Sequence, residues 1–225
     1  MGGESLSALE RRIDYRFKNA ELLNLALTHK SHGRDNNERL EFLGDAVLGY
    51  VVGGMLFRQH PDWREDALSL ARAHLVRGVT LAEIGQELKL GEFIRLGTGE
   101  RKSGGSDRSS IQANAVEAII GAVHEDGGID AAVALIEKLF GRRARVVNPE
   151  ILKDPKTQLQ EILQSVQRPL PEYEVVEVSG EAHARRYTVR CTLTDASLSG
   201  KATASSRREA EKAAAQTVMD QYVND

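Results

Sequence analysis

The sequence has only one cysteine, Cys191, in 225 residues, so no disulfide can form within one chain. One cysteine and six histidines are too few and too scattered for a zinc site or a Cys/His nucleophile. The segment Met1–Arg12 lacks the apolar stretch of a secretory signal. No uninterrupted apolar run approaches the roughly 20 residues of a membrane-spanning helix. We therefore expect a cytoplasmic protein with no membrane partner.

Neither sign of charge dominates the sequence. Lys and Arg number 30, Asp and Glu number 33, and the formal net charge is -3. Bulk charge therefore gives no indication of nucleic-acid binding, and an RNA-binding surface would have to arise from local clustering. Hydrophobic residues make up 41% and charged residues 28%, as in soluble proteins with a substantial core. The length allows one large domain or two small ones.

The most informative stretch is residues 37–52, which has the apolar spacing of a partly buried helix. Glu38, Glu41 and Asp45 fall at i, i+3 and i+7, so three carboxylates share one face. Like charges at this spacing repel, and burying them beside a core costs more. This pattern favours a bound cation, or chemistry that needs one. A solvated acidic stripe is the alternative, although the acidic face is narrow and flanked by apolar residues.

The same helix contains four glycines, Gly44, Gly49, Gly53 and Gly54. Each is expected to cost about 1 kcal/mol relative to alanine. Their presence indicates that another backbone packs closely, either within the subunit or across a dimer interface. A fraying helix end at Gly53 and Gly54 is the alternative.

The first part of the chain is predicted to be all helical, as a domain spanning residues 5–140. Thr80 is predicted to cap the fifth helix, and residues 97–105 form a glycine-rich loop that does not match a P-loop. A basic segment ending at Asn148 and Pro149 predicts a linker over 141–153. The predicted helices cover 5–13, 19–27, 37–57, 65–76, 81–88, 109–126 and 129–140.

The second part, residues 154–224, has a different periodicity. Asp154 is a predicted N-cap, and Pro155 fits the first helical position. A helix over 156–164 is followed by strands at 173–178, 185–193 and 197–204, and by a final helix over 207–222. The sequence therefore predicts two domains, the first all-α and the second α+β in the order α-β-β-β-α.

A second polar pair completes the candidate site. Asn114 and Glu117 share a face of the helix at 109–126. Oxygen ligands of this kind suit Mg²⁺, which prefers carboxylates, waters and substrate phosphate. Such an ion activates water and neutralises charge on a phosphodiester, so the implied reaction is hydrolysis by in-line attack. The set that spacing supports is Glu38, Glu41, Asp45, Asn114 and Glu117. Glu65 opens the helix at 65–76, where an acid in the first turn favours the helix dipole.

The run Asn37-Glu-Arg-Leu-Glu-Phe-Leu-Gly-Asp45 resembles the signature motif of bacterial ribonuclease III. The resemblance implies a Mg²⁺-dependent endoribonuclease, with Mn²⁺ as an alternative ion, that cuts double-stranded RNA such as rRNA precursors and other structured transcripts. It also implies 5′-phosphate and 3′-hydroxyl ends, short 3′ overhangs and a homodimer formed through the nuclease domain. By this resemblance Glu41, Asp45, Asn114 and Glu117 hold the ion, Asp45 and Glu117 are the principal catalytic residues, and Glu38 and Glu65 assist at the scissile strand.

Asn114 stands where the family is expected to have aspartate. Its amide oxygen can ligate Mg²⁺, but one negative charge is missing. A non-catalytic double-stranded RNA-binding protein on a degenerate nuclease fold is therefore the alternative function. Against it, a pure binder has no reason to hold several carboxylates near RNA phosphates.

The order of elements after residue 154 resembles a double-stranded RNA-binding domain, which reads A-form shape over roughly 16 base pairs. A compact cationic edge at the start of the last helix suits phosphates, and the first helix and the turn at 180–183 match the minor-groove contact regions. Ala202 and Ala204 replace the usual glycines, and the domain is not basic overall, so we expect modest, salt-dependent affinity. The predicted RNA-binding residues are Thr157, Gln158, Glu161, His183, Arg207, Arg208 and Lys212.

Overall fold

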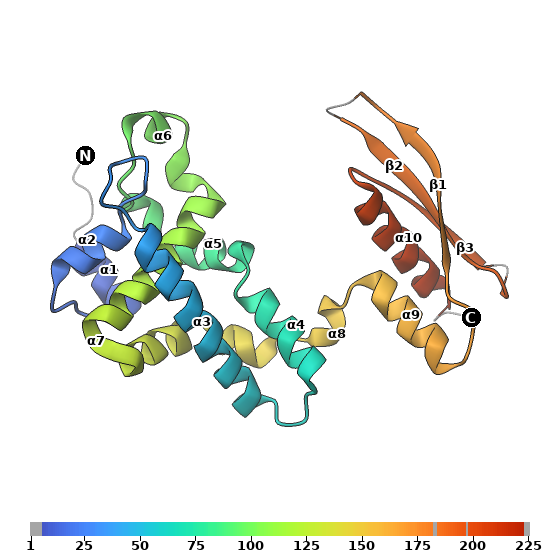
Figure 1. The fold of residues 1–225 in the computed structure, drawn as a ribbon, viewed down its shortest axis with the longest axis horizontal. Helices are drawn as coiled ribbons and strands as arrows, with labels where there is room; N and C mark the ends of the chain where they lie inside the picture. The colour runs from blue at the N-terminus through green and yellow to red at the C-terminus, as the bar shows by residue number, and fades with distance from the viewer. Residues whose placement is uncertain (1–5, 182–183, 197, 223–225) are drawn as a thin grey trace. The chain divides into compact units, whose positions relative to one another are not determined.

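The chain forms two compact units in the computed structural model, Met1–Leu152 and Lys153–Asp225. The structure describes residues 6–181, 184–196 and 198–222. Figure 1 shows that the first unit is built from helices and that the second combines helices with a β-sheet. The predicted fold class, an all-α domain followed by an α+β domain, is confirmed.

A central pair of helices, α3 (Glu38–Gln59) and α7 (Ser109–Val146), makes the most extensive contact in the first unit. Both helices bury apolar side chains in one continuous core. The remaining elements of this unit surround the pair: α1 (Leu6–Ile13), α2 (Ala20–Ala26), α4 (Glu65–Leu75), α5 (Gly78–Glu87), the 3₁₀ turn η1 (Leu90–Glu92), α6 (Thr98–Lys102), the 3₁₀ turn η2 (Gly105–Asp107) and α8 (Pro149–Leu152).

Helix α7 bends at Gly128, whose φ of 80° and ψ of -174° are not helical. The prediction of two helices separated at Gly127 and Gly128 is confirmed by this kink. Just before the bend, the carboxylate of Asp126 accepts hydrogen bonds from the Tyr15 hydroxyl at 2.7 Å and from the backbone N–H of Lys18 at 2.8 Å. The carboxylate therefore ties the segment between α1 and α2 to the bend of α7.

Three local predictions differ from the structure. Helix α5 begins at Gly78, and Thr80 is not its cap because its hydroxyl donates to the His74 carbonyl at 2.9 Å. The glycine-rich segment contains the short helix α6. Helix α7 continues to Val146 and buries Gly141 and Ala144, so the first part of the linker expected at 141–153 is a packed helix.

Helix α3 is the one helix among the described residues that is long and apolar enough to cross a membrane. It nevertheless carries Glu38, Glu41 and Asp45, and it buries residues such as Leu48 and Val52 completely. These features identify α3 as the core helix of a globular unit.

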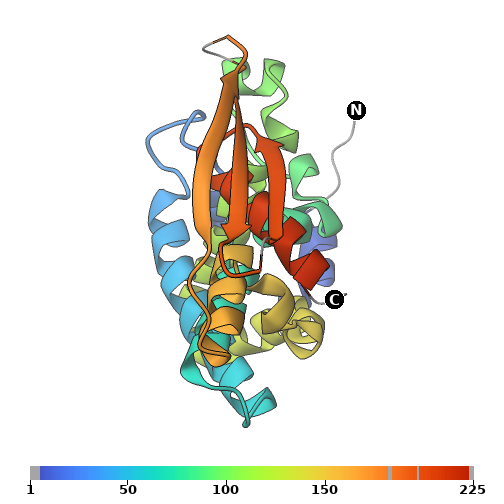
Figure 2. The same ribbon diagram turned by 90° about the vertical axis from the view of Figure 1, so that its right-hand side faces the viewer.

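The second unit contains α9 (Pro155–Ser165), β1 (Glu172–Ser179), β2 (Arg186–Leu193), β3 (Leu198–Ala204) and α10 (Arg207–Tyr222). The three strands form an antiparallel sheet in the order β1-β2-β3, and Figure 2 shows α10 behind this sheet. The predicted start of α9 is confirmed, because Asp154 Oδ1 accepts the Lys156 N–H at 3.0 Å and Pro155 is the first helical residue. A register shift between Val175 and Glu177 accounts for the imperfect alternation of β1.

Candidate functional site

The candidate site lies where α3 and α7 cross. A Cβ atom at Gly44 would overlap the backbone carbonyl of Glu117, so the two helices approach more closely than any residue other than glycine allows. This close approach brings the side chains of Glu41 and Asp45 on α3 near those of Asn114 and Glu117 on α7. The structure thus joins two polar groups that are far apart in the sequence.

The carboxylates of this cluster are partly removed from water and repel one another. Desolvation, with further contributions from Asp45 and Glu41, raises the pKa of Glu117 to about 7. Desolvation also raises the pKa of Glu41, although a hydrogen bond with Asn114 partly opposes the shift. Carboxyl groups with pKa values raised by burial and by like charges are typical of functional sites.

Lys30 is a residue of this site that the sequence analysis did not identify. Its Nζ lies 3.3 Å from Oε1 of Glu38, and its charge acts to lower the pKa of Glu41. Glu38 itself is exposed at the first turn of α3. The available signal was a lysine in the loop directly before an acidic helix, which is too common a pattern to be specific.

Glu65 does not join the cluster within one chain. It is the first residue of α4, and its carboxylate accepts a hydrogen bond from Ser69 at 2.7 Å. Helix α4 follows the turn at the C-terminal end of α3, as Figure 1 shows. Since an α-helix rises about 1.5 Å per residue, that end of α3 lies roughly 20 Å from Asp45.

The donor set matches a divalent metal ion in chemical type. Within residues 6–181, 184–196 and 198–222, no three His, Cys, Asp or Glu side chains converge as a preformed metal site. Three carboxylates and an amide oxygen are nevertheless the ligands that a hard divalent ion prefers. Such an ion would also remove the repulsion that raises the pKa values of Glu41 and Glu117. The residues therefore fit a divalent cation by their chemistry.

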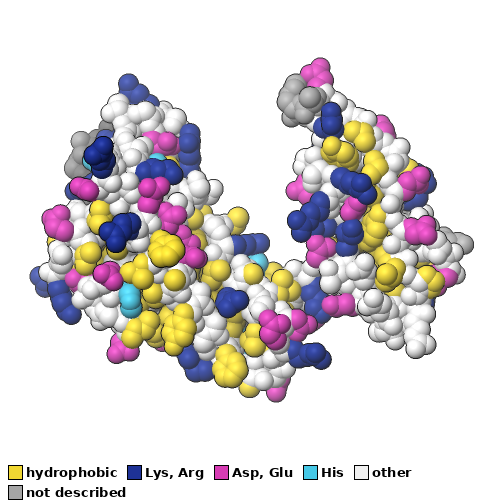
Figure 3. All heavy atoms as spheres, in the orientation of Figure 1, with side chains coloured by type: hydrophobic (Ala, Val, Ile, Leu, Met, Phe, Trp, Pro, Cys, Tyr) yellow, Lys and Arg dark blue, Asp and Glu magenta, His cyan; other side chains and the backbone are white. Residues whose placement is uncertain are grey.

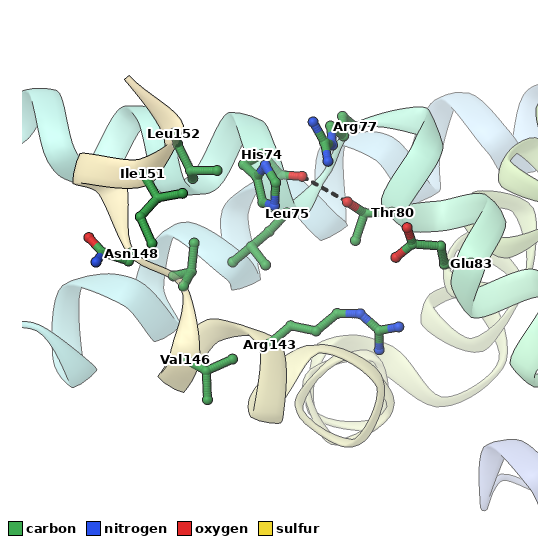
Figure 4. A pocket seen from close by; sticks show the side chains of 11 residues that line it. His74, Leu75, Arg77, Thr80, Glu83, Arg143, Val146, Asn148, Ile151 and Leu152 are labelled. Carbon is green, nitrogen blue, oxygen red and sulfur yellow. Dashed lines mark hydrogen bonds between the residues drawn. The ribbon is translucent and has the colours of Figure 1, made fainter. Parts of the chain in front are cut away.

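A separate cavity of about 340 Å³ lies between α4, α5, α7 and α8. His74, Arg77, Thr80, Glu83 and Arg143 are among its lining residues, and Figure 4 shows their arrangement. Burial lowers the pKa of His74, and the nearby charge of Arg77 contributes. The cavity includes none of the clustered residues of α3 and α7, so we assign it no part in RNA cleavage.

The predicted cationic edge is present in the second unit. Figure 3 shows Lys and Arg side chains gathered on the side of this unit that carries α10. Arg207 and Arg208 are exposed at the start of α10. Arg207 Nε lies 2.8 Å from Oε1 of Glu211, and Lys212 Nζ lies 2.8 Å from Oδ2 of Asp154. Arg207 and Lys212 are therefore held by acidic neighbours.

The predicted minor-groove residues lie on α9. Thr157 and Glu161 are exposed and one helical turn apart, with Gln158 beside Thr157. Glu161 pairs with Lys153 at 3.0 Å. His183 lies outside the residues that the structure describes.

These features define a class: a helical nuclease domain with clustered carboxylates, joined to a domain that binds double-stranded RNA. Residues 19–143 match the family model described as Ribonuclease-III-like, and residues 155–222 match the double-stranded RNA binding motif. The chain belongs to the ribonuclease III family, and it is an endoribonuclease that acts on double-stranded RNA.

Similar proteins cover almost the whole chain. The protein named Ribonuclease 3 of Vibrio campbellii is 48% identical over 97% of this chain and 98% of its own length. Ribonuclease 3 of Alkalilimnicola ehrlichii is 50% identical, with coverage of 94% and 93%. Among solved structures, the nuclease domain of ribonuclease III from Campylobacter jejuni is 42% identical, with a TM-score of 0.61, and covers 64% of this chain and 99% of that domain.

Proposed function

We propose that this endoribonuclease requires Mg²⁺, with Mn²⁺ as an alternative ion, held by Glu41, Asp45, Asn114 and Glu117. The supporting observation is that carboxylates from two helices share a partly buried site in which mutual repulsion and desolvation raise the pKa values of Glu41 and Glu117. When bound, Mg²⁺ lowers the pKa of a water and neutralises charge on the phosphodiester. The family is one of nucleases that generally depend on metal ions.

The side chains of the site would position the ion and the phosphodiester. In the metal-free protein, desolvation and repulsion raise the pKa of Glu117 to about 7, and a bound ion would offset that repulsion, so Glu117 would act as an ionised ligand that orients the attacking water. The water oxygen would bond to phosphorus and release its proton to solvent, the bond from phosphorus to the 3′ oxygen would break, and the 3′ oxygen would take up a proton from solvent water. The products are a 5′-phosphate and a 3′-hydroxyl, with short 3′ overhangs because the two strands are cut at offset positions. Lys30 holds Glu38 at the edge of the site.

The proposed enzyme is a homodimer that associates through α3. Phe42, Tyr50 and Phe57 are 81%, 74% and 71% exposed and share one face of this helix. Exposed apolar faces of this kind are typical of protein interfaces. A structure of the nuclease domain of Campylobacter jejuni ribonuclease III is described as having flexibility in a region involved in dimer formation. Phe42 also lines a surface pocket together with four leucines and with charged residues such as Arg39 and Glu125, so this part of the surface offers both apolar and polar contacts to a partner.

A symmetric dimer would also bring Glu65 of one subunit close to the carboxylate cluster of the other. When one face of a helix packs against itself about a two-fold axis perpendicular to the helix, the two copies run antiparallel. The C-terminal end of one α3 then lies near the N-terminal end of the other. Glu65 of the partner subunit would follow that end and approach Glu38, at the scissile strand.

The second unit is proposed to hold the duplex through Arg207, Arg208 and Lys212 on α10 and through the exposed side of α9, which carries Thr157, Gln158 and Glu161. His183, which lies outside the described residues, is proposed to contribute from the part of the sequence between β1 and β2. The substrates are proposed to be rRNA precursors and other structured transcripts in the cytoplasm. The proposed domains are a nuclease domain over 5–140, a connection over 141–153 whose first part is the packed end of α7, and an RNA-binding domain over 154–224.

One assay tests this function. Duplex RNA is incubated with the full-length protein in Mg²⁺ or in EDTA, and the products are mapped. We expect cleavage only with Mg²⁺, and we expect Asp45→Asn and Glu117→Gln variants to bind duplex RNA without cutting it. Binding with no cleavage in any divalent ion would favour the non-catalytic alternative, for which Asn114 is the one supporting residue.

A further inference from the structure

Helices α9 and α10 are joined near their N-terminal ends by two ion pairs that run in opposite directions. Lys156 of α9 reaches Glu211 of α10, with Nζ 2.7 Å from Oε2. Lys212 of α10 reaches Asp154, the N-cap of α9, with Nζ 2.8 Å from Oδ2. We call these four residues the α9–α10 clamp. The second oxygen of Glu211 holds Arg207, so the clamp also orders part of the cationic edge.

The Lys156–Glu211 pair of the clamp is better shielded than most surface ion pairs. The side chain of Glu211 is 12% exposed, and the hydrogen bond from Lys156 lowers its pKa. Lys156 is also fixed to the sheet, because its Nζ lies 4.3 Å from the centroid of the Tyr173 ring on β1. Asp154 uses its other oxygen to accept the Lys156 N–H. Partly buried, charge-assisted contacts of this kind hold their geometry more firmly than exposed pairs do.

Apolar burial between these two helices is non-directional and does not by itself select one pairing of polar groups. The buried face of α10 includes Ala210, Ala214 and Ala215, which are all fully buried. Val218 and Met219 complete this face, which shares one core with Leu159 and Leu163 of α9. A pair of opposed ion pairs, in contrast, is satisfied at one relative position of the helices. Polar contacts of this type can specify register even where they add little stability.

We propose that the α9–α10 clamp sets the distance between the two RNA contacts of this domain and thereby its preference for A-form duplexes. The inference rests on the proposed duplex binding, in which Thr157 and Gln158 on α9 face the minor groove and Arg208 on α10 faces phosphates. An A-form duplex has a deep, narrow major groove, whereas that of B-form DNA is about 12 Å wide. Minor-groove and phosphate contacts therefore lie at different separations in the two forms. Lys156 and Glu211 act as positioning residues. They keep the minor-groove and phosphate contacts at the separation that an A-form duplex requires.

The test compares binding of two duplexes of the same sequence, one RNA and one DNA, to the full-length protein in EDTA. The variants are Lys156→Met, Glu211→Gln and the charge-conserving exchange Lys156→Glu/Glu211→Lys. The matched control is Glu174→Gln, which removes another Glu from an ion pair in this domain, with Arg190 at 3.1 Å. Thermal unfolding is measured for every variant, so that loss of the fold is recognised.

We expect each single variant to reduce the ratio of RNA to DNA affinity about tenfold, and the exchange to restore it to within about threefold. The control should keep the ratio of the unmodified protein. A change in overall stability alone would lower both affinities and leave their ratio unchanged. If Glu211→Gln does not fold, Lys156→Met decides, because it leaves Glu211 paired with Arg207.

Two results would overturn the proposal, and they differ from a failure of the proposed function. Folded single variants that keep the full preference for RNA would show that the clamp does not set the spacing. An exchange variant that loses as much preference as the two single variants together would show the same. If the unmodified protein itself failed to bind duplex RNA, the proposed function would fail first, and the inference with it.

Discussion

Gly44 of α3 and Gly121 of α7 face each other at the point where the two helices cross. A Cβ atom at Gly44 would lie 3.0 Å from the backbone nitrogen of Gly121, and one at Gly121 would lie 3.1 Å from the backbone nitrogen of Gly44. At Gly121 a Cβ would also overlap the carbonyl of Leu40. The glycines thus set the distance between the helices, and with it the distance between Asp45 and Glu117.

Replacing Gly44 with alanine should separate the helices and disrupt the carboxylate site. The new methyl group meets backbone that cannot move away, so we expect a loss of about 1–3 kcal/mol in the free energy of unfolding and a much larger relative loss of cleavage. Thermal unfolding and single-turnover cleavage measure the two effects. Gly54→Ala is the matched control in the same helix, because its Cβ would meet only the flexible end of Arg58. Equal cleavage by both variants would contradict the prediction.

The raised pKa of Glu117 predicts an unusual pH dependence of stability. Between its ordinary pKa of 4.5 and about 7, the folded protein keeps a proton that the unfolded chain has released. Stability of the metal-free protein should therefore fall as pH rises through this range. We expect Glu117→Gln to be more stable than the unmodified protein at pH 8 in EDTA, by roughly 1–2 kcal/mol after allowance for solvent screening.

Urea unfolding at pH 4.5 and pH 8 measures this effect. The difference between the two proteins should be small at pH 4.5, where Glu117 is largely protonated in the folded state. Added Mg²⁺ should stabilise the unmodified protein more than the variant, since the ion relieves the repulsion directly. A Glu117→Gln variant that is less stable at pH 8 would refute the assignment of a strained carboxylate.

Asn114 should weaken the binding of the divalent ion. Asparagine supplies a neutral oxygen where aspartate would supply a charged one, so Asn114→Asp should reach half-maximal cleavage at a lower Mg²⁺ concentration, by about tenfold. A Mg²⁺ titration of cleavage measures the shift, with Asn114→Ala as the variant that lacks the oxygen. Identical half-saturation for the unmodified protein and the Asn114→Asp variant would show that this position does not contribute to the ion site.

The exposed apolar face of α3 predicts the effect of a charge placed on it. Phe57→Glu should convert the proposed dimer into a monomer, because an interface core cannot hold an unpaired carboxylate without a cost of several kcal/mol. Sedimentation equilibrium measures the mass, and cleavage should fall with it. Ile151→Glu is the control, since Ile151 on α8 is 79% exposed and lies outside the α3 face. A Phe57→Glu protein that remains a fully active dimer would exclude this face as the interface.

Much of the fold followed from local signals in the sequence. Asp154 with Pro155 begins α9, as the pattern predicted, and the helix expected over 19–27 is present with Asn19 accepting the Glu21 N–H at 3.1 Å. The helix in the glycine-rich segment was missed because Thr98–Lys102 makes a single turn, too short for periodicity to reveal. The end of α7 was placed too early because the exposed arginines after Gly141 hid the buried Ala144.

The candidate site was less predictable than the fold. The acids of α3 share a helical face, which spacing alone predicts. Their approach to Glu117, however, depends on the tertiary contact at Gly44, and the contact of Lys156 with Glu211 joins residues 55 positions apart. The separation of Glu65 from Asp45 within one chain depends on the length and direction of α3, which spacing does not report.

The bend of α7, and the packing of the part of the helix that follows it, depend on the backbone conformation of one residue, Gly128. Its combination of φ and ψ is one that residues with a side chain essentially never adopt. Without the bend, α7 would be a straight rod of about 57 Å, longer than a domain of this size is wide. Leu135, Ile136 and Phe140, which are now buried, would then project into water. A side chain at this position would therefore cost about 1–3 kcal/mol in backbone strain, although its Cβ would meet no other atom within 4 Å.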